Sequence, residues 1–204
     1  MPSEIIVPRL AATDRLVGLP ARALVDAATG KAPGLATAVR FGARGGDLLV
    51  RFDARHRGVS ATLTEENGPL WTEDVVEVFL SVEDTPRHYL EFEVNPLGTR
   101  FSARVDSPRG TREGMRVETF SCPGFSAEVR VRERSWSARL HIPMAKLFGS
   151  FPAVFSGNVF RIDRAAAEFS ALSPTGANPP DFHRPAAFAR FRVAMAPDLN
   201  DVTA

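Results

Sequence analysis

Cysteine is nearly absent from this chain, and its scarcity excludes two ways of holding a fold together. The single cysteine, Cys122, cannot form an intrachain disulfide or a multi-cysteine metal site. The four histidines are scattered without the spacing of zinc ligands. We therefore expect core packing alone to hold the fold, with Cys122 as a half-buried thiol.

An excess of either charge is missing as well. Lys and Arg total 25 against 24 Asp and Glu, which gives a net charge of +1 and no electrostatic reason to expect nucleic acid or an anionic membrane as partner. No run approaches the roughly 18 to 20 apolar residues that span a bilayer. The start also lacks the basic and apolar regions of a secretory signal. We expect a cytoplasmic protein whose partner is small or neutral.

Phenylalanine, proline and glycine are abundant, at 15, 16 and 15 residues. This combination is typical of many short strands separated by turns. A length of 204 residues suits one β-sandwich with a sizeable core. The sequence predicts an all-β, antiparallel β-sandwich of immunoglobulin-like or jelly-roll-like type, formed by residues 1–204 as a single domain with at most one or two short helical turns.

Alternating apolar residues and turn signals locate the strands. A hairpin is predicted with strands at 36–42 and 47–53 around the turn Gly45-Gly46. The remaining predictions are strands at 99–106, 125–132, 135–142, 158–164 and 190–195, a helical turn at 144–148, and a helical turn or irregular edge at 21–28. Segment 170–185 is too rich in Pro, Gly and Asn for regular structure, and such long loops are often functional.

Two further strands, 73–82 and 88–95, carry the informative polar residues. The period of two groups side chains by face: Trp71, Val75, Glu77 and Phe79 around the first strand, and Tyr89, Glu91, Glu93 and Asn95 in the second. If the two strands are neighbours, their acids and the indole point into one shared space.

Glu77 and Glu93 have more than one interpretation. Acids within apolar strands cost free energy unless they are paired or functional. They either contact a ligand or form buried pairs with an arginine such as Arg161 or Arg104. Glycoside hydrolysis also uses two carboxylates, on opposite sides of the bond, but acidic residues are too common for this pair to be specific. We expect no catalysis.

Oxygen-rich positions at Glu73-Asp74, Asp84 and Asp181 leave a structural calcium ion open. No EF-hand-like loop accompanies them. No other cofactor and no other metal site is predicted.

Five ordered segments between residues 70 and 191 resemble a known family. They are LWTEDVVEVFL (70–80), YLEFEVNPLGTRF (89–101), LHIPMAKL (140–147), GNVFRIDR (157–164) and LSPTGANPPDFHRPAAFARF (172–191). In this order they are similar to the family 9 carbohydrate-binding modules and their DOMON-like relatives. The resemblance implies an antiparallel β-sandwich that holds a sugar between aromatic rings, with carboxylate, amide and arginine groups bonded to its hydroxyls.

The resemblance also assigns roles to residues. It implies that Trp71 is the first aromatic plate, that Glu77 accepts from a hydroxyl, and that Asn95 is the polar position after the second strand. Glu93 departs from the pattern, because some sugar-binding members have an arginine there. Leu172 stands where relatives with a WSPT motif have tryptophan, so the second plate is missing unless Phe182 or His183 replaces it.

The sequence thus predicts a non-catalytic domain that binds a mono- or oligosaccharide. The predicted ligand-binding residues are Trp71, Glu77, Glu93, Asn95, Arg161 and His183. A partner glycoside hydrolase would fit this function, which would then assist polysaccharide degradation. The alternatives are a structural or protein-interaction β-sandwich whose sugar site is degenerate and, from the DOMON-like relatives, a haem or redox-cofactor domain.

Overall fold

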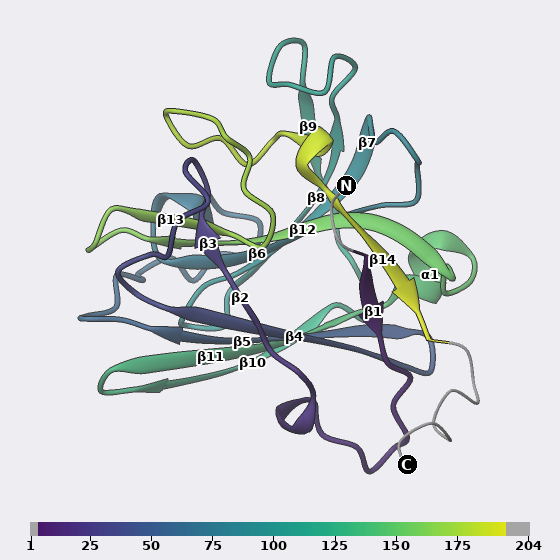
Figure 1. Cartoon of the computed structure of the whole chain (residues 1–204), viewed down its shortest axis with the longest axis horizontal. Helices are drawn as coiled ribbons and strands as arrows, with labels where there is room; N and C mark the ends of the chain where they lie inside the picture. The colour runs from purple at the N-terminus through teal and green to yellow at the C-terminus, as the bar shows by residue number, and fades with distance from the viewer. Residues whose placement is uncertain (1–3, 195–204) are drawn as a thin grey trace.

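The computed structural model describes residues 4–194 and consists of two β-sheets packed face to face. Figure 1 shows the strands of the smaller sheet as one layer and β12 and β6 of the larger sheet as the other. No helix in this part of the chain is long and apolar enough to cross a membrane. The predicted β-sandwich is therefore confirmed.

The larger sheet has nine strands, and its main path runs in the order β1-β14-β12-β6-β7-β8-β9. In that order the strands are β1 (Ile5–Val7), β14 (Ala189–Val193), β12 (Val154–Asp163), β6 (Val75–Ser81), β7 (His88–Val94), β8 (Arg100–Asp106) and β9 (Arg116–Thr119), while β13 (Glu168–Ala171) pairs with β12 and with β3 (Val25–Asp26). Among these strands only β1 and β14 pair in parallel.

The smaller sheet has five antiparallel strands in the order β10-β11-β5-β4-β2. They are β10 (Ser126–Arg132), β11 (Ser135–Ile142), β5 (Asp47–Arg55), β4 (Thr37–Arg44) and β2 (Arg22–Ala23), and the helical turns are α1 (Met144–Phe148), η1 (Leu16–Gly18), η2 (Leu70–Thr72) and η3 (Pro185–Ala187). Gly45 has a φ of +57°, the left-handed conformation that the tight β4–β5 turn requires.

The main core lies between the sheets and follows from the period of two. Val76 and Val78 of β6 point into it, together with Val50 and Trp136 from the smaller sheet. Each of these side chains is at most 1% exposed. Burying one such apolar side chain stabilises the fold by about 1.5–3 kcal/mol, so this layer supplies the packing that a disulfide-free fold needs.

A second apolar cluster covers the outer face of the larger sheet. It includes Phe79 of β6, Phe101 of β8 and Phe160 of β12, and Phe182 from the loop before β14 packs against it. As a result every residue of β6 is buried, on both faces. The face that the sequence assigns to a ligand is therefore largely covered by loops, and a ligand can reach it only where those loops leave a cleft.

The predicted strands and turn correspond to β4 to β8, β10 to β12, β14 and α1. Segment 21–28 forms the short edge strands β2 and β3, and Cys122 is half-buried as expected. Residue 195 of the strand predicted at 190–195 lies outside the described residues. The sequence analysis missed β9, whose four residues are all exposed and carry no alternation, and β13, which overlaps the start of the predicted loop.

Candidate functional site

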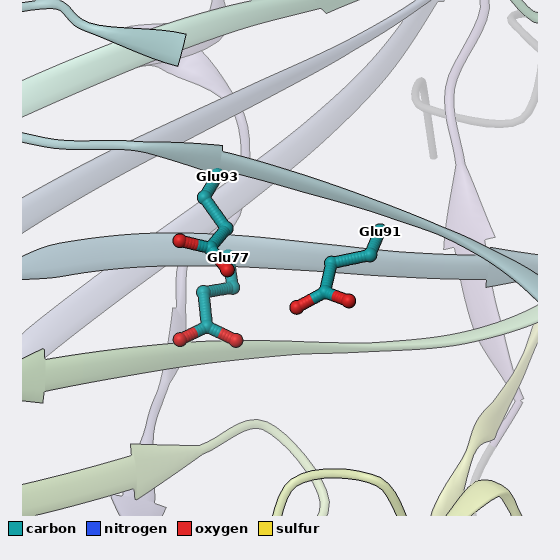
Figure 2. Close-up of side chains that lie close together, drawn as sticks. All are labelled: Glu77, Glu91 and Glu93. Atoms are coloured by element: carbon teal, nitrogen blue, oxygen red, sulfur yellow. The ribbon is translucent and has the colours of Figure 1, made fainter. Parts of the chain in front are cut away.

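Three glutamates lie side by side on the outer face of the larger sheet. Glu77 on β6 pairs directly with Glu93 on β7, and Glu91 lies two residues before Glu93 on the same face. Figure 2 shows the three side chains projecting into the same space. One oxygen from each carboxyl group lies within 4.8 Å of the others. The predicted convergence of Glu77 and Glu93 is therefore present, with Glu91 as a third member.

These carboxyl groups are buried without compensating partners. Glu77, Glu91 and Glu93 are 2%, 4% and 0% exposed. Four of their oxygens, Oε1 of Glu77, Oε2 of Glu91 and both of Glu93, have no hydrogen-bond partner within the described chain. Since buried polar groups are nearly always paired, these three side chains are unusual and require an explanation.

Burial also changes the protonation of the cluster. Loss of solvation, followed by the charge of Glu91, raises the pKa of Glu77 well above its usual value. Burial and the two neighbouring acids do the same to the pKa of Glu93, and burial raises the pKa of Glu91 to about 7. At neutral pH the cluster therefore holds protons, and its carboxyl groups can donate as well as accept hydrogen bonds.

The arginine pairings considered from the sequence are not formed. Arg161 lies opposite Val76, so it points between the sheets, away from the glutamates. There its guanidinium donates to Thr37 Oγ1 at 2.9 Å and pairs with the buried Asp163. Arg104 lies over the ring of Phe120, 4.0 Å from its centroid. The predicted contact between Arg161 and a ligand on the outer face is wrong for this geometry, because the side chain projects from the opposite face of β12.

A cleft of about 370 Å³ opens above the cluster, with Glu77 and Glu91 among its lining residues. Its walls include four aromatic side chains, those of Trp71, Phe101, Phe169 and Phe182. A larger hollow of about 580 Å³ lies on the outer face of the smaller sheet, where arginines dominate and the one tryptophan, Trp136, is 1% exposed. Of the predicted site residues, Trp71, Glu77 and His183 line the aromatic cleft, and Glu93 lies beside Glu77 without lining it.

Trp71 is the accessible aromatic surface of this cleft. Its indole is 43% exposed and meets the ring of Phe101 edge to face, with ring centroids 5.4 Å apart. Leu172 packs against the inter-sheet core and does not line the cleft. Phe182 lines it instead, stacked on Phe160 at 4.2 Å. The substitution that the sequence suggested for the second aromatic residue is therefore present in the cleft wall.

His183 also lines the cleft but is largely a structural residue. Its Nδ1 lies 2.8 Å from the hydroxyl of Tyr89, and its ring packs against Phe79 with centroids 5.2 Å apart. Burial, followed by the positive charge of Arg112, lowers the pKa of His183 to about 4. The ring is thus neutral at pH 7, and Nε2 is the atom left for a ligand.

Asn95 lies outside the cleft. Its Nδ2 donates to the carbonyl of Leu63 at 2.8 Å, and its Oδ1 accepts from the amides of Leu97 and Thr99 at 3.0 Å each. These bonds close the turn between β7 and β8 and attach it to the Leu63 segment. Asn95 therefore supports the fold near the site and is not positioned to bind a ligand in the cleft.

The oxygen-rich positions considered for calcium do not gather. Glu73 binds Thr62, Asp74 accepts from the amides of Ser60 and Arg164, and Asp181 pairs with Arg112 and Arg184, while Asp84 lies near Arg190. Across residues 4–194 the glutamate cluster is the one group of three or more side chains with metal-ligand spacing.

Sequence reasoning missed two arginines that line the cleft, Arg112 and Arg164. Arg112 donates to Asp181 at 2.8 Å, and the Arg164 guanidinium lies over the ring of Phe169, 5.4 Å from its centroid. Arg112 lies in the loop between β8 and β9, where no pattern marks it. Arg164 ends the strand predicted at 158–164, and the period of two places it on the face of the cleft residue Ile162, so it could have been found. Glu91 could have been found, because it shares the face of Glu93 by the period of two.

A β-sandwich with an aromatic, carboxylate-floored cleft on one sheet defines a class of ligand-binding domain, and comparison places this chain within it. The sequence pattern of carbohydrate-binding family 9 matches residues 25–193, and the chain belongs to that family. Comparison with curated proteins gave no match.

Three solved structures share the fold. A candidate carbohydrate-binding protein from Bacteroides uniformis ATCC 8492 is 20% identical, with a TM-score of 0.79 over 95% of this chain and 100% of the other. A family 9 module from Caldicellulosiruptor kristjanssonii in complex with cellotriose is 12% identical, with a TM-score of 0.67 over 99% of each chain. Another structure of a family 9 module from that organism, in complex with glucose, is 11% identical, with a TM-score of 0.63 over 96% and 98%.

Proposed function

We propose that this protein binds a mono- or oligosaccharide in the cleft between Trp71 and Phe182, without catalysing a reaction on it. The observation that carries the proposal is the exposed indole of Trp71 above a floor of buried carboxyl groups. Family membership supports it, as do the related folds whose structures hold cellotriose and glucose.

The two kinds of surface in the cleft match the two kinds of surface on a sugar. A pyranose ring has an apolar C–H face that can lie against the indole of Trp71, and a rim of hydroxyls that need donors and acceptors. Glu77 and Glu91 provide both, because their raised pKa values keep protons on the cluster. The cleft volume of about 370 Å³ is within the range of small-molecule sites.

Binding without bond cleavage follows from where the acids lie. Glycosidases place their two carboxyl groups on opposite sides of the scissile bond. Here the three groups project together from adjacent strands of one sheet. We expect no new reducing ends when the protein is incubated with cello- or xylo-oligosaccharides, and a partner glycoside hydrolase would supply the cleavage. Release of reducing ends that the Glu91→Gln variant abolishes would contradict this part of the proposal.

Intrinsic fluorescence tests sugar binding directly, because the two tryptophans differ sharply in solvent exposure. Trp71 is 43% exposed in the cleft, whereas Trp136 is 1% exposed between the sheets. Titration with glucose, cellobiose, cellotriose and xylotriose should change the emission of Trp71 alone. The Trp71→Ala variant should keep the Trp136 signal and lose both the fluorescence response and the binding heat. An unchanged spectrum and no heat at millimolar sugar would instead favour a structural or protein-interaction role.

A further inference from the structure

The floor of the cleft has more ionisable carboxyl groups beside it than a neutral sugar needs. Glu77 and Glu91 line this floor, and an oxygen of the fully buried Glu93 lies within 4.8 Å of an oxygen of each. Four oxygens of these three side chains lack partners within the described chain, although the side chains are at most 4% exposed. Neutral hydroxyls could satisfy some of these oxygens, but only a cation could take the place of the protons that the buried cluster holds. The structure therefore points to a ligand that brings a positive charge.

We propose that the preferred ligand of this cleft is an amino sugar, whose protonated primary amine binds Glu77, Glu91 and Glu93 while its ring lies against Trp71. This inference rests on the proposed function, since it names the class of sugar bound at the same site. It explains both the cluster and the aromatic wall beside it with one occupant.

The shape of an ammonium group matches the cluster. An ammonium has three N–H donors and no acceptor, and one oxygen from each of the three glutamates lies within 4.8 Å of the others. One nitrogen can therefore donate to all three side chains. A hydroxyl has a single O–H donor and two lone pairs that accept. It cannot donate to all three side chains, so it fits the same position less completely.

The nearby cations do not neutralise the cluster. Arg112 and Arg164 are the positive groups whose fields reach Glu77. Both are held elsewhere, because Arg112 donates to Asp181 at 2.8 Å and Arg164 donates to the carbonyl of Trp71. The third neighbour, His183, is neutral because burial lowers its pKa to about 4. No cation of the described chain therefore takes the place of the protons on the cluster, and that place is left for a ligand.

The surroundings favour an organic amine over a bare divalent cation. Calcium takes six to eight oxygen ligands, commonly including backbone carbonyls. Apart from the acids themselves, the residues directly opposite them across the sheet offer no side-chain oxygen; they are Phe79, Phe101, Phe160 and Ala103. Aromatic faces attract organic ammonium groups, and the two cleft arginines repel a double charge more strongly than a single one.

Calorimetric titration at about pH 6.5, where a primary amine with a pKa near 8 is protonated, tests the proposal. The probes are glucosamine, galactosamine and mannosamine, with glucose and N-acetylglucosamine as matched controls that lack the charge. We expect at least one amino sugar to bind at least tenfold more tightly than glucose, and N-acetylation to abolish that advantage. Glu93→Gln should bring the ratio of the two affinities toward one. Glu118→Gln, an exposed position on β9, should leave the ratio unchanged.

The outcomes separate the two proposals. Equal affinity for glucose and the amino sugars would overturn the amine preference and leave carbohydrate binding intact. Absence of binding by any sugar would overturn both. Stoichiometric binding of Ca²⁺ alone that is lost in Glu93→Gln and competes with the amino sugar would overturn the amine assignment in favour of a metal site. Because the wild-type comparison of ligands needs no variant, the test holds even if Glu93→Gln folds poorly.

Discussion

Glu91 makes the stability of the protein depend on pH in an unusual direction. Its pKa is about 7 in the folded chain against an ordinary value of 4.5, so between these values the folded state binds more protons than the unfolded state. The free energy of unfolding therefore falls as pH rises through this interval. His183 acts oppositely from about pH 4 to 6.5, because its folded pKa lies below the ordinary value.

The variant Glu91→Gln tests this contribution together with the effect of Glu91 on the pKa of Glu77 and Glu93. Urea unfolding between about pH 5 and pH 8 should show that the variant gains stability relative to wild type as pH rises, by about 3 kcal/mol over the interval, since one unit of pKa shift corresponds to about 1.4 kcal/mol. Taking the difference between the two proteins removes the effect of His183. A difference that does not change with pH would show that Glu91 titrates normally.

The sequence was enough to place some of the site residues on the correct face of the sheet but not others. Alternation placed Glu77 and Glu93 on one face, because the opposite residues of β6 and β7 are apolar apart from His88 at the start of β7. Trp71 lies in the turn η2 before β6, so its position in the cleft does not follow from the period of two. It could not place Arg161, since β12 is buried on both faces from Gly157 to Asp163 and its alternation says nothing about which face meets the other sheet. Asn95 follows its strand in a turn, where a side chain bonds the local backbone.

Among the elements, β12 carries an ion pair that the fold depends on. Arg161 and Asp163 are 2% and 1% exposed. The guanidinium also donates to two backbone carbonyls, those of Leu35 just before β4 and of Arg55 at the end of β5. Arg161→Leu leaves a buried carboxylate without its partner and should cost about 3–5 kcal/mol in unfolding free energy.

Two further variants test whether the uncompensated charge of Asp163 causes that loss of stability. Arg161→Leu combined with Asp163→Asn should recover part of the loss, because the amide keeps an oxygen for the Ala166 amide but has no charge. Arg192→Leu removes a half-exposed arginine of β14 and should change stability by less than about 1 kcal/mol. If the double variant is as unstable as the single one, the uncompensated charge is not the cause.

The loop from residue 172 to 188 is the element that forms one wall of the cleft, and Asp181 fixes its shape. This carboxylate accepts from Arg112, Arg184 and the amide of His183, which holds Phe182 in place. Asp181→Ala should weaken sugar binding severalfold in calorimetry although it removes no residue of the aromatic wall. Glu113→Ala, in the neighbouring exposed loop, is the control and should bind normally.

The existence of this loop could be predicted from the sequence, but its conformation could not. Its composition identified it as irregular and functional, but its conformation depends on contacts such as Arg112 with Asp181, 69 residues apart. No local pattern encodes such a contact. The strands differ, because each carries its own alternation.

For the whole molecule, we predict that residues 1–204 unfold as a single domain. The two sheets share one core, and Trp136 belongs to the buried cluster that residues of both sheets form. In a Trp71→Phe variant, where Trp136 is the remaining tryptophan, its fluorescence and the far-ultraviolet circular dichroism should follow the same urea transition. Separated transitions would mean that the sheets unfold independently.

The fold class was predictable from composition and alternation, whereas the order of strands was not. Nothing in the short segment Ile5–Val7 indicates that it pairs in parallel with β14, far along the chain. Such pairings between distant segments are fixed by how the sheets close around the core.

The pairing of β1 with β14 at the edge of the larger sheet, on the right of Figure 1, has a mechanical consequence. Because the two strands run the same way, tension applied through the chain entering Ile5 and leaving Val193 pulls them along their length in opposite directions. The hydrogen bonds between the two strands are then loaded together in shear and do not break one after another. A tether attached through those two points would resist extension until these bonds give way at once.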